Sequence, residues 1–240
     1  MSGGSSSLYA MVFFELSPNY LCKNEISEWE SCHKEEFCGT DIEYKVNWDS
    51  TYSLFNWVEE YDLHCAGKST FGMFGSMYFL GVVIFSMITP PLADKIGRKK
   101  VLVVSSILQL IAMIIQISSR SLSLTYACAF LMGVSMPGRV FVGFHWACEF
   151  MPAKRTPLAT VFILGTDNLV LAVAALYFRY VNVDWKILQI CFCCSLSVGI
   201  LLTMLYFPES PKYVHNMKRY ADARAIIATI AKKNNMQEIS

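Results

Sequence analysis

The residues best suited to specific chemistry are carboxylates and guanidinium groups that flank long apolar runs. Asp94, Arg98, Glu149 and Arg155 form the most coherent set, since each lies at or near the end of such a run. A guanidinium and a carboxylate can form two parallel, directional hydrogen bonds, because two N–H groups of the planar guanidinium match the two carboxylate oxygens. We therefore predict an ion-pair network that joins helix ends. The alternative is that these charges only fix which side of a membrane the segments face.

A second group of candidates lies inside the apolar runs. Arg139 falls within one run, where a charge is costly in lipid unless it faces a cavity or a partner. We predict that Arg139 contacts an anion, a lipid headgroup or another subunit. The alternative is that it reaches the membrane surface or pairs with Asp167 in the next run. His145 shares the run of Arg139, and a lone membrane histidine is more often a hydrogen-bonded packing residue than a proton relay.

The sequence contains no constellation that indicates catalysis. It has no glycine-rich phosphate loop, no H-E-x-x-H and no set of serine, histidine and acid in a workable frame. Cys191, Cys193 and Cys194 lie in an apolar run at a spacing that fits no metal site. We predict a protein that is not an enzyme and holds neither a metal nor a cofactor. The absence of a basic patch argues against nucleic acid as a partner.

The composition is that of a membrane protein. Of the 240 residues, 54% are hydrophobic and 16% are charged, against about 25% charged in soluble domains. The mean hydropathy is +0.39. A membrane span takes about 20 residues, so a short apolar stretch over 8–16 cannot cross alone. We predict an all-α membrane protein with a truncated first helix and five full transmembrane helices, over 71–92, 101–117, 124–150, 158–178 and 185–207.

The charged residues divide between the two sides of the predicted bundle. The loop over 90–100 (PPLADKIGRKK) carries one acid and four bases, and segments 152–157 and 208–240 are also basic. Short loops rich in lysine and arginine stay on the inner side of a membrane, so these segments define the inner face. The chain then divides into a truncated first helix and N-terminus (1–21), an acidic outer loop (22–70), a transmembrane bundle (71–207) and an inner tail (208–240) with an amphipathic helix over 221–233.

The predicted outer loop is acidic and holds four cysteines. Residues 22–70 contain eleven acids against four lysines, a net charge of −7. An even number of cysteines in one polar loop (Cys22, Cys32, Cys38 and Cys65) predicts two disulfides on an oxidising side. Three pairings exist and the sequence does not choose among them; four free thiols are the alternative. The loop has no N-x-[ST] sequon, which favours an organelle membrane, such as the mitochondrial inner membrane, over the plasma membrane.

Several of these stretches resemble one transporter family. The segment 94–100 (DKIGRKK) resembles the signature loop between the second and third helices of the major facilitator superfamily. Residues 208–213 (PESPKY) resemble the PESPR motif that follows the sixth helix in the organic cation, carnitine and organic anion transporters. Residues 57–65 (WVEEYDLHC) resemble the end of that branch's outer loop. Glu149-Phe150 resembles its TEF segment, and Gly133 stands sixteen residues earlier, as the branch's fourth-helix glycine does.

The resemblance implies the N-terminal six-helix bundle of a twelve-helix transporter, in which two bundles rock around a central cavity. It implies a gating or topology network of Asp94, Gly97, Arg98, Glu149, Arg155 and Glu209 at the inner face. Two residues depart from the family's pattern. Pro90 replaces the glycine that opens the basic-loop motif, and Ala129 replaces an arginine four residues before Gly133.

Two functions follow as expectations. Because the 240 residues contain no counterpart of the second bundle, we expect an accessory or structural subunit of a larger membrane complex. The alternative is a transporter of small organic ions that works with a partner half or as a dimer, and a third reading is a fragment cut from a longer protein. The expected partners are the lipid bilayer, bound lipids, and other membrane subunits or a complementary half.

Overall fold

The computed structural model describes residues 9–23, 28–152 and 154–233, so the predictions for 1–8 and 234–240 lie outside the described residues. Residues 9–14 form a short helix at the start of the chain. The named elements follow in order: β1 (Tyr20–Lys23), β2 (Trp29–Cys32), α2 (Lys34–Phe37), β3 (Tyr44–Val46), α3 (Trp57–Glu60), α4 (Lys68–Ile96), α5 (Arg98–Ser118), α6 (Leu122–Pro137), the π-helix η1 (Gly138–Val142), α7 (Gly143–Cys148), α8 (Thr156–Tyr180), α9 (Trp185–Tyr206), α10 (Pro211–Asn216) and α11 (Tyr220–Lys233).

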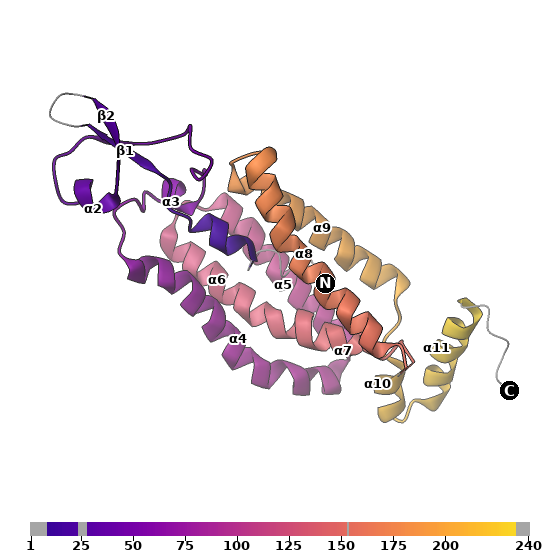
Figure 1. The fold of residues 1–240 in the computed structure, drawn as a ribbon. Helices are drawn as coiled ribbons and strands as arrows, with labels where there is room; N and C mark the ends of the chain where they lie inside the picture. Colours follow the sequence, from indigo (N-terminus) through magenta and orange to yellow (C-terminus); the bar gives the residue numbers. More distant parts are fainter. Residues whose placement is uncertain (1–8, 24–27, 153, 234–240) are drawn as a thin grey trace.

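Five long apolar helices form the body of the molecule. They are α4, α5, the continuous stretch Leu122–Cys148, α8 and α9, and each is long and apolar enough to cross a membrane. Figure 1 shows them side by side, with the N-terminal elements at one end and α10 and α11 at the other. We call these the outer and inner ends, after the predicted orientation. The protein is thus a multi-pass membrane protein, and the five predicted spans are confirmed.

The predicted loop over 90–100 is wrong in extent. Helix α4 continues through Pro90 and Pro91 as far as Ile96, and α5 begins at Arg98. Gly97 alone reverses the chain, with a φ of +110° that only glycine adopts easily. Proline removes a helical hydrogen bond and bends a helix without always ending it, and Figure 1 shows α4 curving along the bundle.

Small and polar residues allow the helices to pack in lipid. A Cβ on Gly81 of α4 would lie 2.8 Å from the backbone nitrogen of Val134 in α6, so these two helices touch through their backbones. On α5, Gln109 and Gln116 are almost fully buried. Gln109 accepts a hydrogen bond from Ser135 Oγ at 2.7 Å, and Gln116 accepts one from the Gln189 amide at 3.2 Å. These side chains tie α5 to α6 and α9 at membrane depth.

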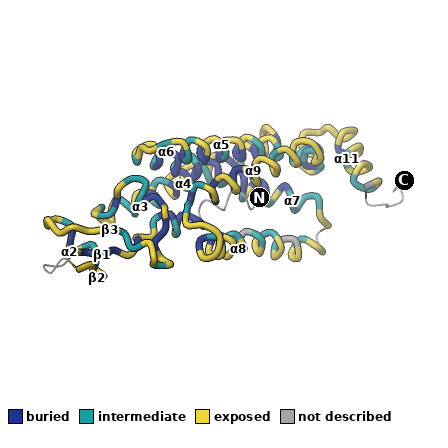
Figure 2. Tube along the Cα trace, turned by 90° about the horizontal axis from the view of Figure 1, so that it is seen from above, coloured by how far each residue is buried: buried dark blue, intermediate teal, exposed yellow. Residues whose placement is uncertain are grey.

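Helix α8 is mostly exposed over its inner half, where it lines a cavity together with η1 and α7. Its outer end packs through Ala174 and Phe178, with the Phe178 ring 5.4 Å from that of Phe13 in the short N-terminal helix. Most of the described residues of α8 are nonetheless exposed, as the yellow tube in Figure 2 shows.

The outer loop contains a small sheet that the sequence analysis did not predict. Strands β1, β2 and β3 form an antiparallel sheet in the order β2-β1-β3, so the all-α prediction holds for the bundle but not for this loop. The two predicted disulfides are present, and they pair Cys22 with Cys32 and Cys38 with Cys65. Tyr20 and Phe37 form the core of this unit.

Helix α3 fastens the outer loop to the bundle. Asn56, its N-cap, is fully buried and donates to the carbonyl oxygens of Phe13 and Leu16 at 2.8 Å each. Glu60 accepts a hydrogen bond from Lys186 Nζ of α9 at 2.8 Å. The short N-terminal helix, the outer loop and α9 therefore meet at one point.

Candidate functional site

The inner end of the bundle holds a cluster of paired charges. Arg98, the first residue of α5, forms an ion pair with Glu149, the residue that caps α7. It also donates to Asp94 on α4, at 3.1 Å. The Arg98 and Glu149 side chains are 18% and 10% exposed, whereas Asp94 is 68% exposed. Because water screens exposed pairs, the link to Glu149 contributes more than the link to Asp94.

Glu209 joins the segment after α9 to the turn at Gly97. One of its carboxylate oxygens accepts from the backbone nitrogens of Lys99, at 2.9 Å, and of Ser210, at 3.0 Å. A Cβ on Gly97 would lie 2.5 Å from the other oxygen. Gly97 is therefore needed twice, for its positive φ and for the close approach of Glu209.

Ser210 is a member of this cluster that sequence reasoning missed. Its hydroxyl donates to Glu149 and accepts from the backbone nitrogen of Tyr213, at 3.1 Å, as the N-cap of α10. Tyr213 in turn donates to the carbonyl oxygen of Lys95, at 3.1 Å. The available signal was Ser210-Pro211, because serine followed by proline is a common start of a helix. We call Asp94, Arg98, Glu149, Glu209 and Ser210 the inner network.

The structure brings together five of the six residues predicted for this site. Asp94, Gly97, Arg98, Glu149 and Glu209 meet at the inner end, but Arg155 does not join them. It is exposed at the start of α8 and forms no ion pair with any residue that the structure describes. Arg155 is the N-cap of α8, and no described hydrogen bond or ion pair joins its side chain to the inner network.

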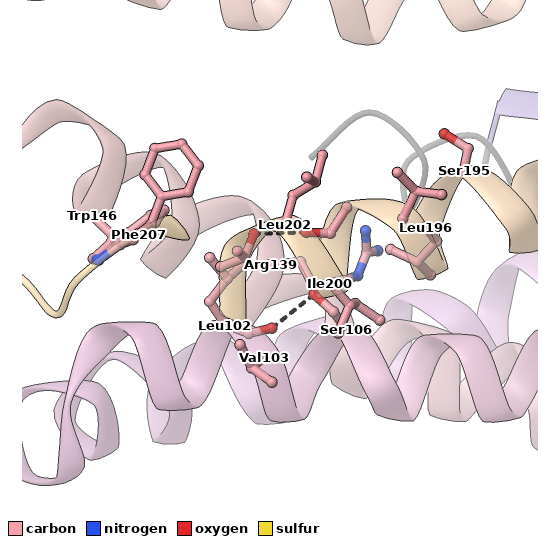
Figure 3. A pocket seen from close by; sticks show the side chains of 13 residues that line it. Leu102, Val103, Ser106, Arg139, Trp146, Ser195, Leu196, Ile200, Leu202 and Phe207 are labelled. Carbon is pink, nitrogen blue, oxygen red and sulfur yellow. Dashed lines mark hydrogen bonds between the residues drawn. The ribbon is translucent and has the colours of Figure 1, made fainter. Parts of the chain in front are cut away.

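The three candidates within the membrane do not form a common site. Arg139 lies in η1, is 3% exposed and lines a cavity with Trp146, toward α5 and α9 (Figure 3). His145 lines a different cavity, with Phe144 and Thr160, between α7 and α8. Asp167 belongs to α8, but its side chain lies outside the described part of the chain, so its predicted pairing with Arg139 stays a prediction.

The inner network links four parts of the fold. The ends of α4 and α7, the start of α5 and the segment before α10 are joined by charge-assisted hydrogen bonds, which are about twice as strong as neutral ones. All these parts belong to a single bundle. The network can therefore hold the inner end of that bundle as one body.

The bundle of membrane-spanning helices and the charged network at its inner end agree with the superfamily that the motifs resemble. The sequence profile of the Major Facilitator Superfamily matches residues 46–236. The chain belongs to this superfamily.

The named relatives agree with the branch that the motifs indicated. The chain is 26% identical to mouse "Solute carrier family 22 member 4", with 85% of the chain and 36% of the relative covered. It is also 26% identical to human "Organic cation/carnitine transporter 2", over 75% of the chain and 32% of that protein. A fruit-fly "Organic cation transporter protein" is 25% identical over 93% of the chain and 43% of its own length. The chain thus spans less than half the length of these relatives.

Proposed function

We propose that this chain forms one of the two rocking bodies of a transporter for small organic ions. The observation that carries the proposal is the inner network, since the Arg98–Glu149 pair, Asp94, Glu209 and Ser210 connect parts of the bundle that would otherwise move separately. A rocking mechanism needs each bundle to move as a unit around a shared cavity. The cavity itself would form between this bundle and a facing one.

The substrate class comes from the relatives. Two of the three names, those of the human and fruit-fly relatives, describe transporters of organic cations or carnitine, so we propose that small organic cations are carried. These relatives are transporters rather than enzymes, which supports the prediction of a non-enzymatic protein.

The test is uptake by the complete chain, purified in mild detergent with any chains bound to it and reconstituted in liposomes. Radiolabelled tetraethylammonium is the probe, and a labelled neutral alcohol of similar size is the control. We expect saturable uptake of the cation above that of protein-free liposomes, and no saturable uptake of the alcohol. A preparation that contains a facing bundle and shows no saturable cation uptake would contradict the proposal.

A second candidate is an accessory subunit of a larger membrane complex. It is favoured by the two departures from the family's pattern, Pro90 and Ala129. Ala129 is fully buried in α6, so the position of the family's arginine is filled here by a small packing residue. In the uptake experiment this candidate predicts no saturable cation uptake, together with retention of the chain in a stable complex at fixed stoichiometry. Fractionation of the membranes of cells that express the chain, before detergent is added, tests the predicted organelle location.

A further inference from the structure

A cavity at the inner half of the bundle carries a buried positive charge. It has a volume of about 390 Å³, within the range of roughly 300 to 1,000 Å³ found for ligand pockets. Residues of α5, η1, α7 and α9 line it, and Figure 3 shows the Arg139 guanidinium among Ser106, Leu196 and Ile200. None of the described residues that line the cavity is acidic.

Arg139 is the cationic hydrogen-bond donor among the described residues that line this cavity, beside the neutral indole N–H of Trp146. The Ser106 hydroxyl already donates to the carbonyl oxygen of Leu102, at 2.7 Å, and the Thr203 hydroxyl to that of Gly199, at 2.8 Å. Their remaining lone pairs accept hydrogen bonds and do not donate them. Arg139 is only 3% exposed, and a cation at low dielectric attracts an anion far more strongly than one in water.

The cavity borders the bilayer through α9. Val198 and Leu202 both line it, yet they are 56% and 45% exposed on a helix that is long enough to cross a membrane. An occupant that enters past these side chains comes from lipid, so it needs an alkyl chain as well as a charge. The wall suits such a chain, because Leu102, Val103 and Leu196 are aliphatic.

We propose that this cavity binds an amphiphile with a single anionic head. Oxygen atoms of the head lie on the Arg139 guanidinium, and the alkyl chain lies along the apolar wall of α5 and α9. The head is the carboxylate of a free fatty acid or the phosphate of an anionic phospholipid, which share this chemistry. The site does not depend on the proposed transport, and it is tested without an uptake assay.

Trp146 supplies a local signal for the test, because it lines the cavity. The complete chain in nanodiscs of zwitterionic lipid is titrated with brominated palmitate, brominated phosphatidylglycerol or the brominated methyl ester of palmitate. Bromine quenches nearby tryptophan fluorescence, and a Trp146→Phe variant identifies the component that belongs to this residue. We expect saturable quenching by one or both anionic probes and none by the uncharged ester. The anionic probe whose quenching saturates shows whether the bound head is a fatty-acid carboxylate or a phospholipid phosphate.

Three variants separate recognition from folding. Arg139→Gln removes the charge, and we expect it to weaken binding at least about tenfold, since charge-assisted hydrogen bonds are lost. Leu202→Phe narrows the cavity and is expected to weaken binding, whereas Leu201→Phe is the matched control on an exposed residue that does not line it. Equal saturable quenching by the ester, no saturable quenching by any probe, or equal binding in the Leu202 and Leu201 variants would overturn the proposal. So would a photoreactive residue at position 202 that crosslinks mainly to another protein chain.

Discussion

Gly97 is the residue at which the inner network depends most on backbone conformation. A Gly97→Ala variant would have to keep a φ of +110° and would place its Cβ 2.5 Å from a Glu209 oxygen. We expect a loss of about 1 to 3 kcal/mol in the free energy of unfolding, as for other strained residues, measured by thermal unfolding in detergent. Gly165→Ala is the control, because that helical position has open space around it. Equal stability of the two variants would contradict this account of the turn.

Tyr20 gives the outer loop a dependence on alkaline pH. Burial raises the pKa of its phenol to about 12, with smaller contributions from Tyr44 and Glu59. Between pH 10 and this value the folded loop holds a proton that the unfolded chain releases, so stability falls as the pH rises. We expect the unfolding temperature to fall less between pH 9 and pH 11 in Tyr20→Phe than in the parent chain. A parallel fall in both would show that Tyr20 does not control this dependence.

The charged members of the site could be predicted from residue type, but their contacts could not. Arg98 and Glu149 stand out because ionisable groups next to apolar runs need partners. The contact of Glu209 with Lys99 joins residues 110 positions apart, and no local pattern encodes that distance. Ser210 escaped notice for the same reason, since its hydroxyl meets Glu149 only when α7 and α10 come together. Arg155 was included for its charge near the end of an apolar run and for the family resemblance, but as the exposed N-cap of α8 it forms no described ion pair with the network.

At the scale of elements, Asn56 decides whether the short N-terminal helix stays attached to the bundle. Its amide donates to Phe13 and Leu16, and its side-chain oxygen accepts from the Val58 nitrogen at 3.0 Å. Asn56→Ala would leave the buried Val58 nitrogen without this partner, at a cost of about 1 to 3 kcal/mol, and would remove both hydrogen bonds to the N-terminal segment. We expect faster amide hydrogen exchange over residues 9–16 in this variant. Asn47→Ala is the control, because the Asn47 side chain accepts a hydrogen bond from the Asp49 nitrogen in an exposed turn. Unchanged hydrogen exchange in both variants would contradict the role of Asn56.

The presence of each membrane-spanning helix was easier to predict than the residues at which it begins and ends. Apolar length predicts five spans, since lipid forces each span to satisfy its backbone hydrogen bonds internally. The end of α4 was placed too early because prolines usually mark helix ends, whereas Pro90 and Pro91 lie within this helix. The sheet was not predicted because its strands have only three or four residues. Their pairing depends on the loops and disulfides that connect them, which leave no local sequence pattern.

At the scale of the whole molecule, the fold places the outer loop and the tail at opposite ends of the bundle. Tyr52 in the loop and Met217 after α10 are both exposed, and they suit a test of the predicted orientation. In a chain whose five free cysteines are replaced by alanine, we expect an impermeant maleimide to label Tyr52→Cys from the outer side only. Met217→Cys should react only after the membrane is opened. Labelling of both from one side would refute the orientation.

The pairing of Arg98 with Glu149 offers the most direct test of the central claim, that the inner network holds this bundle as one rocking body. Arg98→Glu and Glu149→Arg each place like charges together, and the double variant restores opposite charges across the same contact. We expect each single variant to lose most of the saturable uptake of tetraethylammonium in liposomes, and the double variant to recover a substantial part of it. Uptake in both single variants equal to that of the parent chain, or a double variant no better than either, would contradict the account.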